Sequence, residues 1–161
     1  MNILAIDPGN IDTAYCVIDA ETLKPIAFDK TQNELVLEQI VNPEHKIDRI
    51  AIEMIASYGM PVGKEVFDTC RWIGRFEQAA YEHTDCGIDL VYRKDVKLHI
   101  CGDSRANDTN IRHALIDRFA THDLRAGKGT KKKPDFFYGF RVDIWAAFAV
   151  GITYIETVVG K

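Results

Sequence analysis

The sequence has no apolar stretch long enough to cross a membrane and no cysteine spacing typical of a metal site. A membrane-spanning helix needs about 20 consecutive apolar residues, and no run in this 161-residue chain approaches that length. We expect no signal peptide, because the chain leads directly into an apolar strand. Widely spaced cysteines predict free thiols and hence a reducing cytoplasm. These cysteines are Cys16, Cys70, Cys86 and Cys101.

Size and composition are those of an ordinary globular protein. Hydrophobic residues make up 47% of the chain and charged residues 27%, and no internal repeat is visible, so we predict a single domain over residues 1–161. The net charge of −4 argues weakly against a nucleic-acid partner. However, the segment from Arg125 to Arg141 contains six basic residues and only one acidic residue, Asp135. Such a local patch, rather than the total charge, sets the field that DNA meets.

The first apolar segment ends on a carboxylate. Residues 3–6 form a short apolar run that predicts a strand buried on both faces. Asp7 follows where the strand leaves the core, and Pro8 and Gly9 end it. A second apolar run over residues 14–18 predicts a hairpin with the first. A buried carboxylate is costly unless something positive neutralises it, although Asp7 could equally cap the turn.

Strands and helices alternate along the rest of the chain, which predicts an α/β fold with a mixed sheet covered by helices. We expect Thr31 and Glu34 to form a capping box at the start of the first helix. The segment 121–139 is the least ordered by composition. The further strands are expected at 25–30, 49–54 and 89–93, and the helices after residue 31 and at 64–83, 95–101, 107–119 and 142–157.

Three acids stand at places where they can meet. Asp7 and Glu53 each end a predicted buried strand, and Asp143 begins an apolar helix. Acids held close together repel, so such a cluster persists only if one is protonated or a cation lies between them. Oxygen ligands favour Mg²⁺ or Mn²⁺, and two such ions about 3.5–4 Å apart can promote phosphodiester hydrolysis. Each acid alone also has an ordinary explanation as a turn cap, an ion-pair partner or a helix-dipole partner.

Several segments, taken in order, resemble the RuvC-type Holliday junction resolvases of the ribonuclease H-like superfamily. The likeness covers most of the chain. Residues 3–9 and 13–18 match the family's first hairpin, residues 51–53 its second acidic strand, residues 96–97, Gly102, Ala106 and the helix from Asn110 the segment before the next acidic block, and residues 143–154 its last helix.

This resemblance implies a fold, an activity and a set of site residues. The fold is a ribonuclease H-like sheet with three antiparallel strands followed by parallel ones. The activity is metal-dependent endonucleolytic cleavage of branched DNA, above all of four-way junctions, by a homodimer. Asp7, Glu53 and Asp143 would bind two Mg²⁺ or Mn²⁺ ions, and Lys97 would lie near the scissile phosphate. A flap or RNA:DNA-hybrid nuclease and a non-catalytic junction-binding module remain alternatives.

The chain departs from the family pattern in ways that indicate a divergent member, for which a phage origin is one explanation. The family has two metal-binding side chains three residues apart at the start of the last helix. Here Ala146 occupies the second place, or Phe140 the first if the match is shifted. Asp135 and Asp103 are the candidate substitutes. A lysine expected before the Asn110 helix is replaced by Asp108, and Arg105 could supply its charge.

The remaining candidates are residues that would contact DNA or a second subunit. Tyr58 and Met60 lie in the loop after Glu53, where an exposed side chain could wedge against an unstacked base. Trp72 and Phe76 on the long helix are the candidate dimer contacts, with burial inside the monomer as the rival explanation. The candidate phosphate contacts are Arg105, Lys128, Lys131, Lys132 and Lys133.

Overall fold

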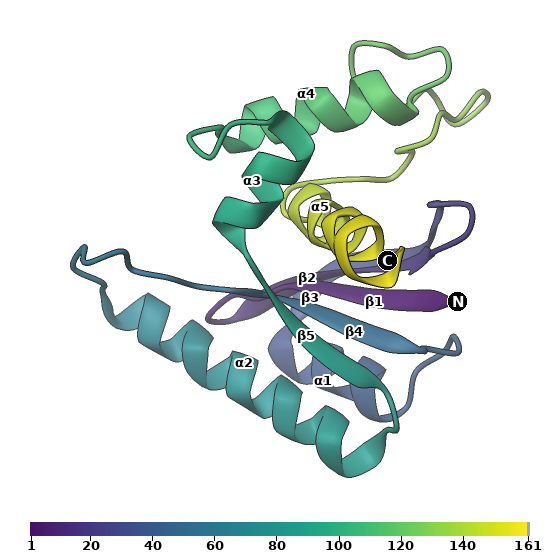
Figure 1. Ribbon diagram of the computed structural model, residues 1–161. Helices are drawn as coiled ribbons and strands as arrows, with labels where there is room; N and C mark the ends of the chain where they lie inside the picture. Colours follow the sequence, from purple (N-terminus) through teal and green to yellow (C-terminus); the bar gives the residue numbers. More distant parts are fainter. Residues whose placement is uncertain (161) are drawn as a thin grey trace.

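The computed structural model, which describes residues 1–160, is built on a five-stranded sheet with helices on both faces (Figure 1). The strands lie in the order β3-β2-β1-β4-β5. The β1–β2 and β2–β3 pairs are antiparallel, whereas β1, β4 and β5 run parallel, which confirms the predicted mixed sheet. The strands are β1 (Asn2–Asp7), β2 (Asp12–Asp19), β3 (Pro25–Gln32), β4 (Arg49–Met54) and β5 (Gly87–Tyr92).

The helices form two layers, one on each side of the sheet (Figure 1). One layer contains α1 (Asn33–Val41) and α2 (Lys64–His83). The other contains α3 (Arg93–Cys101), α4 (Asp108–Phe119) and α5 (Ile144–Tyr154), which continues into a π-helical turn at Ile155–Val159. Among residues 1–160, no helix is both long and apolar enough to cross a membrane. All four cysteines are free, as predicted.

Two helix starts differ from the prediction. Thr31 lies within β3, and α1 begins after Gln32 with no side-chain cap, so the predicted capping box is wrong. β-Strand pairing with β2 extends to Gln32 and takes up the residues that the local pattern assigned to a cap. Asp143 precedes α5 as its N-cap residue instead of lying in its first turn.

The two faces of β1 belong to two separate parts of the core. Ile3 and Ala5 pack in the part under α5, whereas Leu4 and Ile6 pack in the part under α1 and α2. Successive side chains of a strand point to opposite faces. Asp7 therefore shares the α5 side of the sheet with Ile3 and Ala5.

The buried helix α5 lies directly on the centre of the sheet. At Gly151 an added Cβ would stand 2.3 Å from the Ile18 Cδ1 atom and 2.9 Å from the Ala5 Cβ atom. Helix and sheet can approach this closely only because Gly151 has no side chain. This contact fixes the position of α5 over β1 and β2, and with it the position of Asp143 at the start of the helix.

The segment predicted to be least ordered is held in place by the Asp135 carboxylate. Its oxygens accept backbone N–H bonds from Thr121, His122 and Asp123 at 2.7–3.1 Å, and from Phe136 at 2.7 Å. Burial alone would raise the pKa of Asp135, but these donors outweigh it and hold the pKa far below its usual range. The expectation that Asp135 substitutes as a metal ligand is therefore wrong, because both of its carboxylate oxygens already accept hydrogen bonds from the loop backbone.

Candidate functional site

Strand register brings Asp7 and Glu53 side by side. Ala5 is paired with Ala51 in the parallel β1–β4 ladder, so two residues further along both strands Asp7 comes level with Glu53, on strands about 4.8 Å apart. Ala5 and Ala51 both belong to the core under α5. Because side chains alternate along a strand, both acids point to the α5 side, where Asp143 precedes the helix.

The three acids, called the acid cluster from here on, lie close enough to perturb one another. Burial, followed by the charges of Glu53 and Asp143, raises the pKa of Asp7 well above its usual value. Burial also raises the pKa of Glu53, although Arg93 and then Lys97 oppose that shift. The structure thus brings together the acids that the sequence proposed, and their role as metal ligands stays a prediction.

Two basic side chains that sequence analysis missed lie against the acid cluster. The Lys30 Nζ atom is 2.5 Å from the Asp143 Oδ2 atom, and the Arg93 Nη1 atom is 3.2 Å from the Glu53 Oε2 atom. Strand register places Lys30 near the acid cluster, because Lys30 is paired with Ala14, which is itself paired with Asp7. These cations account for part of the stability of a cluster of like charges.

The donor set of the acid cluster fits a hard divalent cation. Carboxylate oxygens are the ligands that Mg²⁺ and Mn²⁺ prefer. Only burial and nearby charges act on the pKa of Asp7, and within the described residues its carboxylate has no hydrogen bond or ion pair. The cluster is not a preformed cage, since within residues 1–160 no three His, Cys, Asp or Glu side chains are placed to hold an ion. Glu53 and Asp143 are instead paired with Arg93 and Lys30.

A concave surface of about 350 Å³, called the Tyr58 hollow from here on, opens next to the acid cluster. Tyr58 is 66% exposed and has a φ of +50°, a left-handed conformation that non-glycine residues rarely adopt. Lys97, predicted from a different part of the chain, lines the same hollow. Its full lining is Tyr58, Arg93, Lys94, Lys97 and Ser104.

The other predicted DNA contacts lie outside this hollow. Met60 is exposed in the same loop as Tyr58. Arg105 and Asp103 pair with each other through an exposed contact at 3.5 Å. Both line a different hollow, whose lining includes none of the three acids, so Asp103 is left without support as a substitute ligand. Lys128, Lys131, Lys132 and Lys133 lie in the loop segment between α4 and α5. Figure 1 shows that segment leaving the C-terminal end of α4.

The length of α4 separates those lysines from the acid cluster. Asp108 at the start of α4 lines a small hollow together with Asp143. The lysine segment follows the other end of this 12-residue helix, which is about 18 Å long. Contact of these lysines with phosphates therefore stays a prediction about a more distant part of a DNA substrate.

A buried hydrogen-bond network fixes the turn that follows Asp7. The Thr13 hydroxyl donates to the Asn33 Oδ1 atom at 2.6 Å and accepts from the Gly9 N–H at 3.1 Å. The Asn33 Nδ2 group donates to the Gly9 carbonyl at 2.9 Å. Gly9 also sits so close to the chain that a Cβ would lie 2.1 Å from the Asp12 carbonyl oxygen. The turn is thereby locked, and it holds the end of β1 in place.

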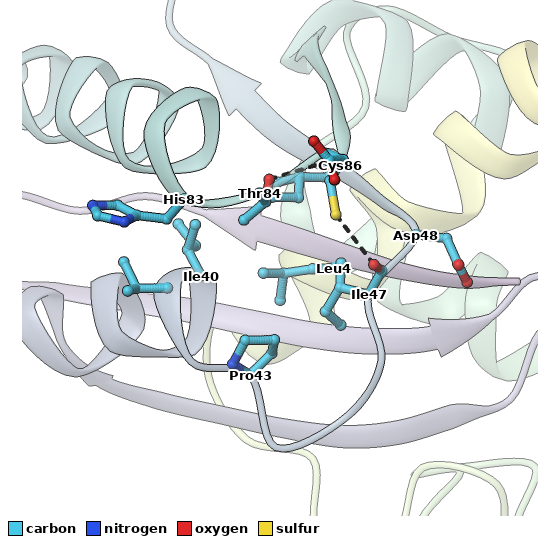
Figure 2. Close-up of a pocket in the computed structure, with 11 residues that line it drawn as sticks. Leu4, Ile40, Pro43, Ile47, Asp48, His83, Thr84 and Cys86 are labelled. Atoms are coloured by element: carbon cyan, nitrogen blue, oxygen red, sulfur yellow. Dashed lines mark hydrogen bonds between the residues drawn. The ribbon is translucent and has the colours of Figure 1, made fainter.

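A different pocket, of about 400 Å³, lies at the opposite end of β1 and β4 (Figure 2). The Cys86 thiol donates there to the Ile47 carbonyl at 3.1 Å. None of the predicted site residues lines this pocket, so it is separate from the acid cluster. The side chains labelled in Figure 2 are Leu4, Ile40, Pro43, Ile47, Asp48, His83, Thr84 and Cys86.

Comparison with known proteins identifies the fold. No protein-family model and no curated protein sequence matches the chain. A solved structure of Thermus thermophilus RuvC matches with a TM-score of 0.70 at 13% identity, covering 99% of this chain and 97% of that one. T. thermophilus RuvC in complex with a Holliday junction substrate matches with a TM-score of 0.71 at 14% identity, covering 99% and 96%. The chain therefore has the RuvC-type, ribonuclease H-like fold that the sequence predicted.

Proposed function

We propose that the chain is a metal-dependent endonuclease that cuts branched DNA, with four-way junctions as its preferred substrate. The observation that carries this proposal is the acid cluster, which forms where β1, β4 and the start of α5 meet in a RuvC-type fold. The match to T. thermophilus RuvC in complex with a Holliday junction substrate supports branched DNA as the substrate class.

The residues around the acid cluster have distinct tasks in this proposal. Asp7, Glu53 and Asp143 hold two Mg²⁺ or Mn²⁺ ions. When bound, the ions supply Lewis acidity toward the attacking water and the leaving oxygen of a phosphodiester. The Lys97 ammonium faces the Tyr58 hollow and lies near enough to Glu53 to lower its pKa. Lys97 thus presents a fixed positive charge to a phosphate that enters the hollow.

The loop after β4 supplies the contacts to an opened base pair. Tyr58 and Met60 are both strongly exposed at its tip. An exposed aromatic ring or thioether that does not pack on its own protein can stack against a base at the branch point. Arg105 and the lysines at 128 and 131–133 then contact the backbone of the duplex arms.

A cleavage assay on synthetic substrates tests the proposal. With Mg²⁺ or Mn²⁺, we expect nicking of a four-way junction at least about tenfold faster than of a linear duplex, and no cleavage with a chelator. Preferential cutting of a flap or an RNA:DNA hybrid would instead make the chain another kind of ribonuclease H-like nuclease. Junction binding without cleavage under any divalent ion would make it a binding module.

We also propose that the chain works as a homodimer, because resolution of a junction needs two symmetric cuts. Of the two predicted contacts, Phe76 needs correction, whereas Trp72 is only half-buried and stays a candidate. Phe76 is fully buried in the core under α2, and Trp72 packs against it with the ring centroids 5.7 Å apart. The apolar side chains that α2 leaves open are instead Phe67 and Tyr81, which are 60% and 68% exposed. Together with Trp72, these two are our candidates for the contact.

The change Phe67→Ser is expected to shift the chain from dimer to monomer in analytical ultracentrifugation. The expected loss of dimer affinity is about tenfold or more, since an apolar anchor leaves the interface. Leu124→Ser removes a similarly exposed apolar side chain in the loop after α4 and should leave the dimer intact. A wild-type chain that sediments as a monomer at all concentrations would contradict the proposal.

A further inference from the structure

Arg93 lies between two acids and between two concave surfaces. Its guanidinium contacts Glu53 with one nitrogen and Asp108 with the other. It lines the Tyr58 hollow on one side, and on the other it lines the small hollow that Asp108 and Asp143 share. The side chain is only 27% exposed. Arg93 therefore contacts the acid cluster directly and also lines the DNA-facing Tyr58 hollow.

The pairing of Arg93 with Glu53 competes with metal binding, because the guanidinium occupies one of the two carboxylate oxygens that a metal ion would use. A divalent cation at Glu53 would lie within a few ångströms of the guanidinium, where like charges repel strongly. Arg93 has one other anchor, the exposed Asp108 carboxylate at the start of α4. A guanidinium released from Glu53 but still held by Asp108 remains at the wall of the Tyr58 hollow. There it can make a bidentate contact with a phosphate.

We propose that Arg93 is a positioning residue that exchanges Glu53 for a DNA phosphate when a divalent cation binds, with Asp108 as its anchor. This inference rests on the proposed function. It makes metal binding and DNA binding favour each other, because each ligand stabilises the same position of one side chain. By linkage, the metal raises DNA affinity by the same factor by which DNA raises metal affinity.

Mn²⁺ titration of the DNA-free protein by calorimetry tests the competition for Glu53. Arg93→Gln should bind Mn²⁺ about threefold or more tightly than the wild type, because the competing cation is gone. Asp108→Asn should bind it more weakly, because Arg93 then has Glu53 as its only acidic partner. Lys24→Gln, an exposed charge in the β2–β3 turn, should leave the affinity unchanged. Unchanged or weaker Mn²⁺ binding by Arg93→Gln overturns the proposal.

A double-mutant cycle separates an anchor from a ligand at Asp108. If Asp108 acts through Arg93, Asp108→Asn should weaken Mn²⁺ binding clearly less in the Arg93→Gln background than in the wild type. An equal loss in both backgrounds would mean that Asp108 acts on the ion directly, and the assigned role of anchor would be wrong.

Junction affinity measured with and without Ca²⁺ tests the coupling itself. The gain in junction affinity on adding Ca²⁺ should be about threefold or more larger for the wild type than for Arg93→Gln. An equal gain overturns the proposal. If Asp7→Asn cuts junctions normally, the proposed function fails. If Asp7→Asn is inactive but Arg93→Gln matches the wild type in Mn²⁺ affinity and coupling, only the role of Arg93 fails.

Discussion

Asp7→Asn is expected to slow metal-dependent cleavage of a four-way junction by about a thousandfold or more. The substitution removes an anionic oxygen from the middle of the acid cluster, where burial and the charges of Glu53 and Asp143 converge on Asp7. Junction binding should stay within a few fold of the wild type, because it depends on basic side chains elsewhere. Cleavage is measured under single-turnover conditions, and binding by fluorescence anisotropy with Ca²⁺.

The thermal midpoint separates lost chemistry from lost folding in this experiment. Asparagine has nearly the shape of aspartate and relieves repulsion within the acid cluster, so the Asp7→Asn protein should melt no lower than the wild type. Glu21→Gln, a neutralised acid in the β2–β3 turn, is the matched control and should cut normally. Wild-type cleavage by Asp7→Asn would show that the acid cluster is not the site of the reaction.

The acids could be found from the sequence because their positions follow from local patterns. A short apolar run that ends on a carboxylate fixes a strand, its buried length and the point where it leaves the core. Both β1 and β4 show this pattern, and their parallel register places Asp7 level with Glu53. The pairing of β1 with β4 was the one step that needed the family resemblance as well as the pattern.

Lys30 and Arg93 were missed because nothing near them in the sequence points to the acids. Strand register aligns Lys30 with Asp7 through Ala14. From that position its side chain contacts Asp143, 113 residues away in the sequence. Arg93 is simply the first residue of α3, and its acidic partners come from β4 and α4. Contacts of this kind depend on tertiary pairing, which composition and periodicity do not contain.

The errors on the long helix and in the loop before α5 have a shared cause: a local sequence pattern does not show which partner a residue contacts. A helical apolar pattern shows that Phe76 has an apolar neighbour but not whether that neighbour belongs to the same chain. A segment rich in glycine and lysine shows few apolar contacts, and the Asp135 carboxylate replaces them with backbone hydrogen bonds. The order of that segment thus depends on the Asp135 carboxylate, together with the Asp123 carboxylate and the buried rings of Phe137 and Phe140.

Asp135→Asn should therefore lower the thermal midpoint by about 5–10 °C, a large effect for one exchange of an oxygen for a nitrogen. In the wild type the carboxylate oxygens accept hydrogen bonds from the backbone N–H groups of residues 121–123. In asparagine one of the two oxygens becomes an NH₂ group, which is a donor and cannot accept those bonds. Asp117→Asn, an exposed acid on α4, is the matched control and should change the midpoint by no more than a degree or two. A midpoint within that same range for Asp135→Asn would contradict the anchoring role.

The pH dependence of the same pair of proteins tests the cause. Because the folded pKa of Asp135 lies below its unfolded value, its stabilisation is fully present above about pH 4 and is lost as the pH falls toward the folded pKa. The difference in midpoint between wild type and Asp135→Asn should therefore begin to shrink below about pH 4 and should continue to shrink as the pH falls further. Phe137 and Phe140, from the anchored loop, pack on Trp145 in the first turn of α5. A loosened loop should thus also displace Asp143 and slow cleavage, in contrast to Asp7→Asn, which should slow cleavage without lowering the midpoint.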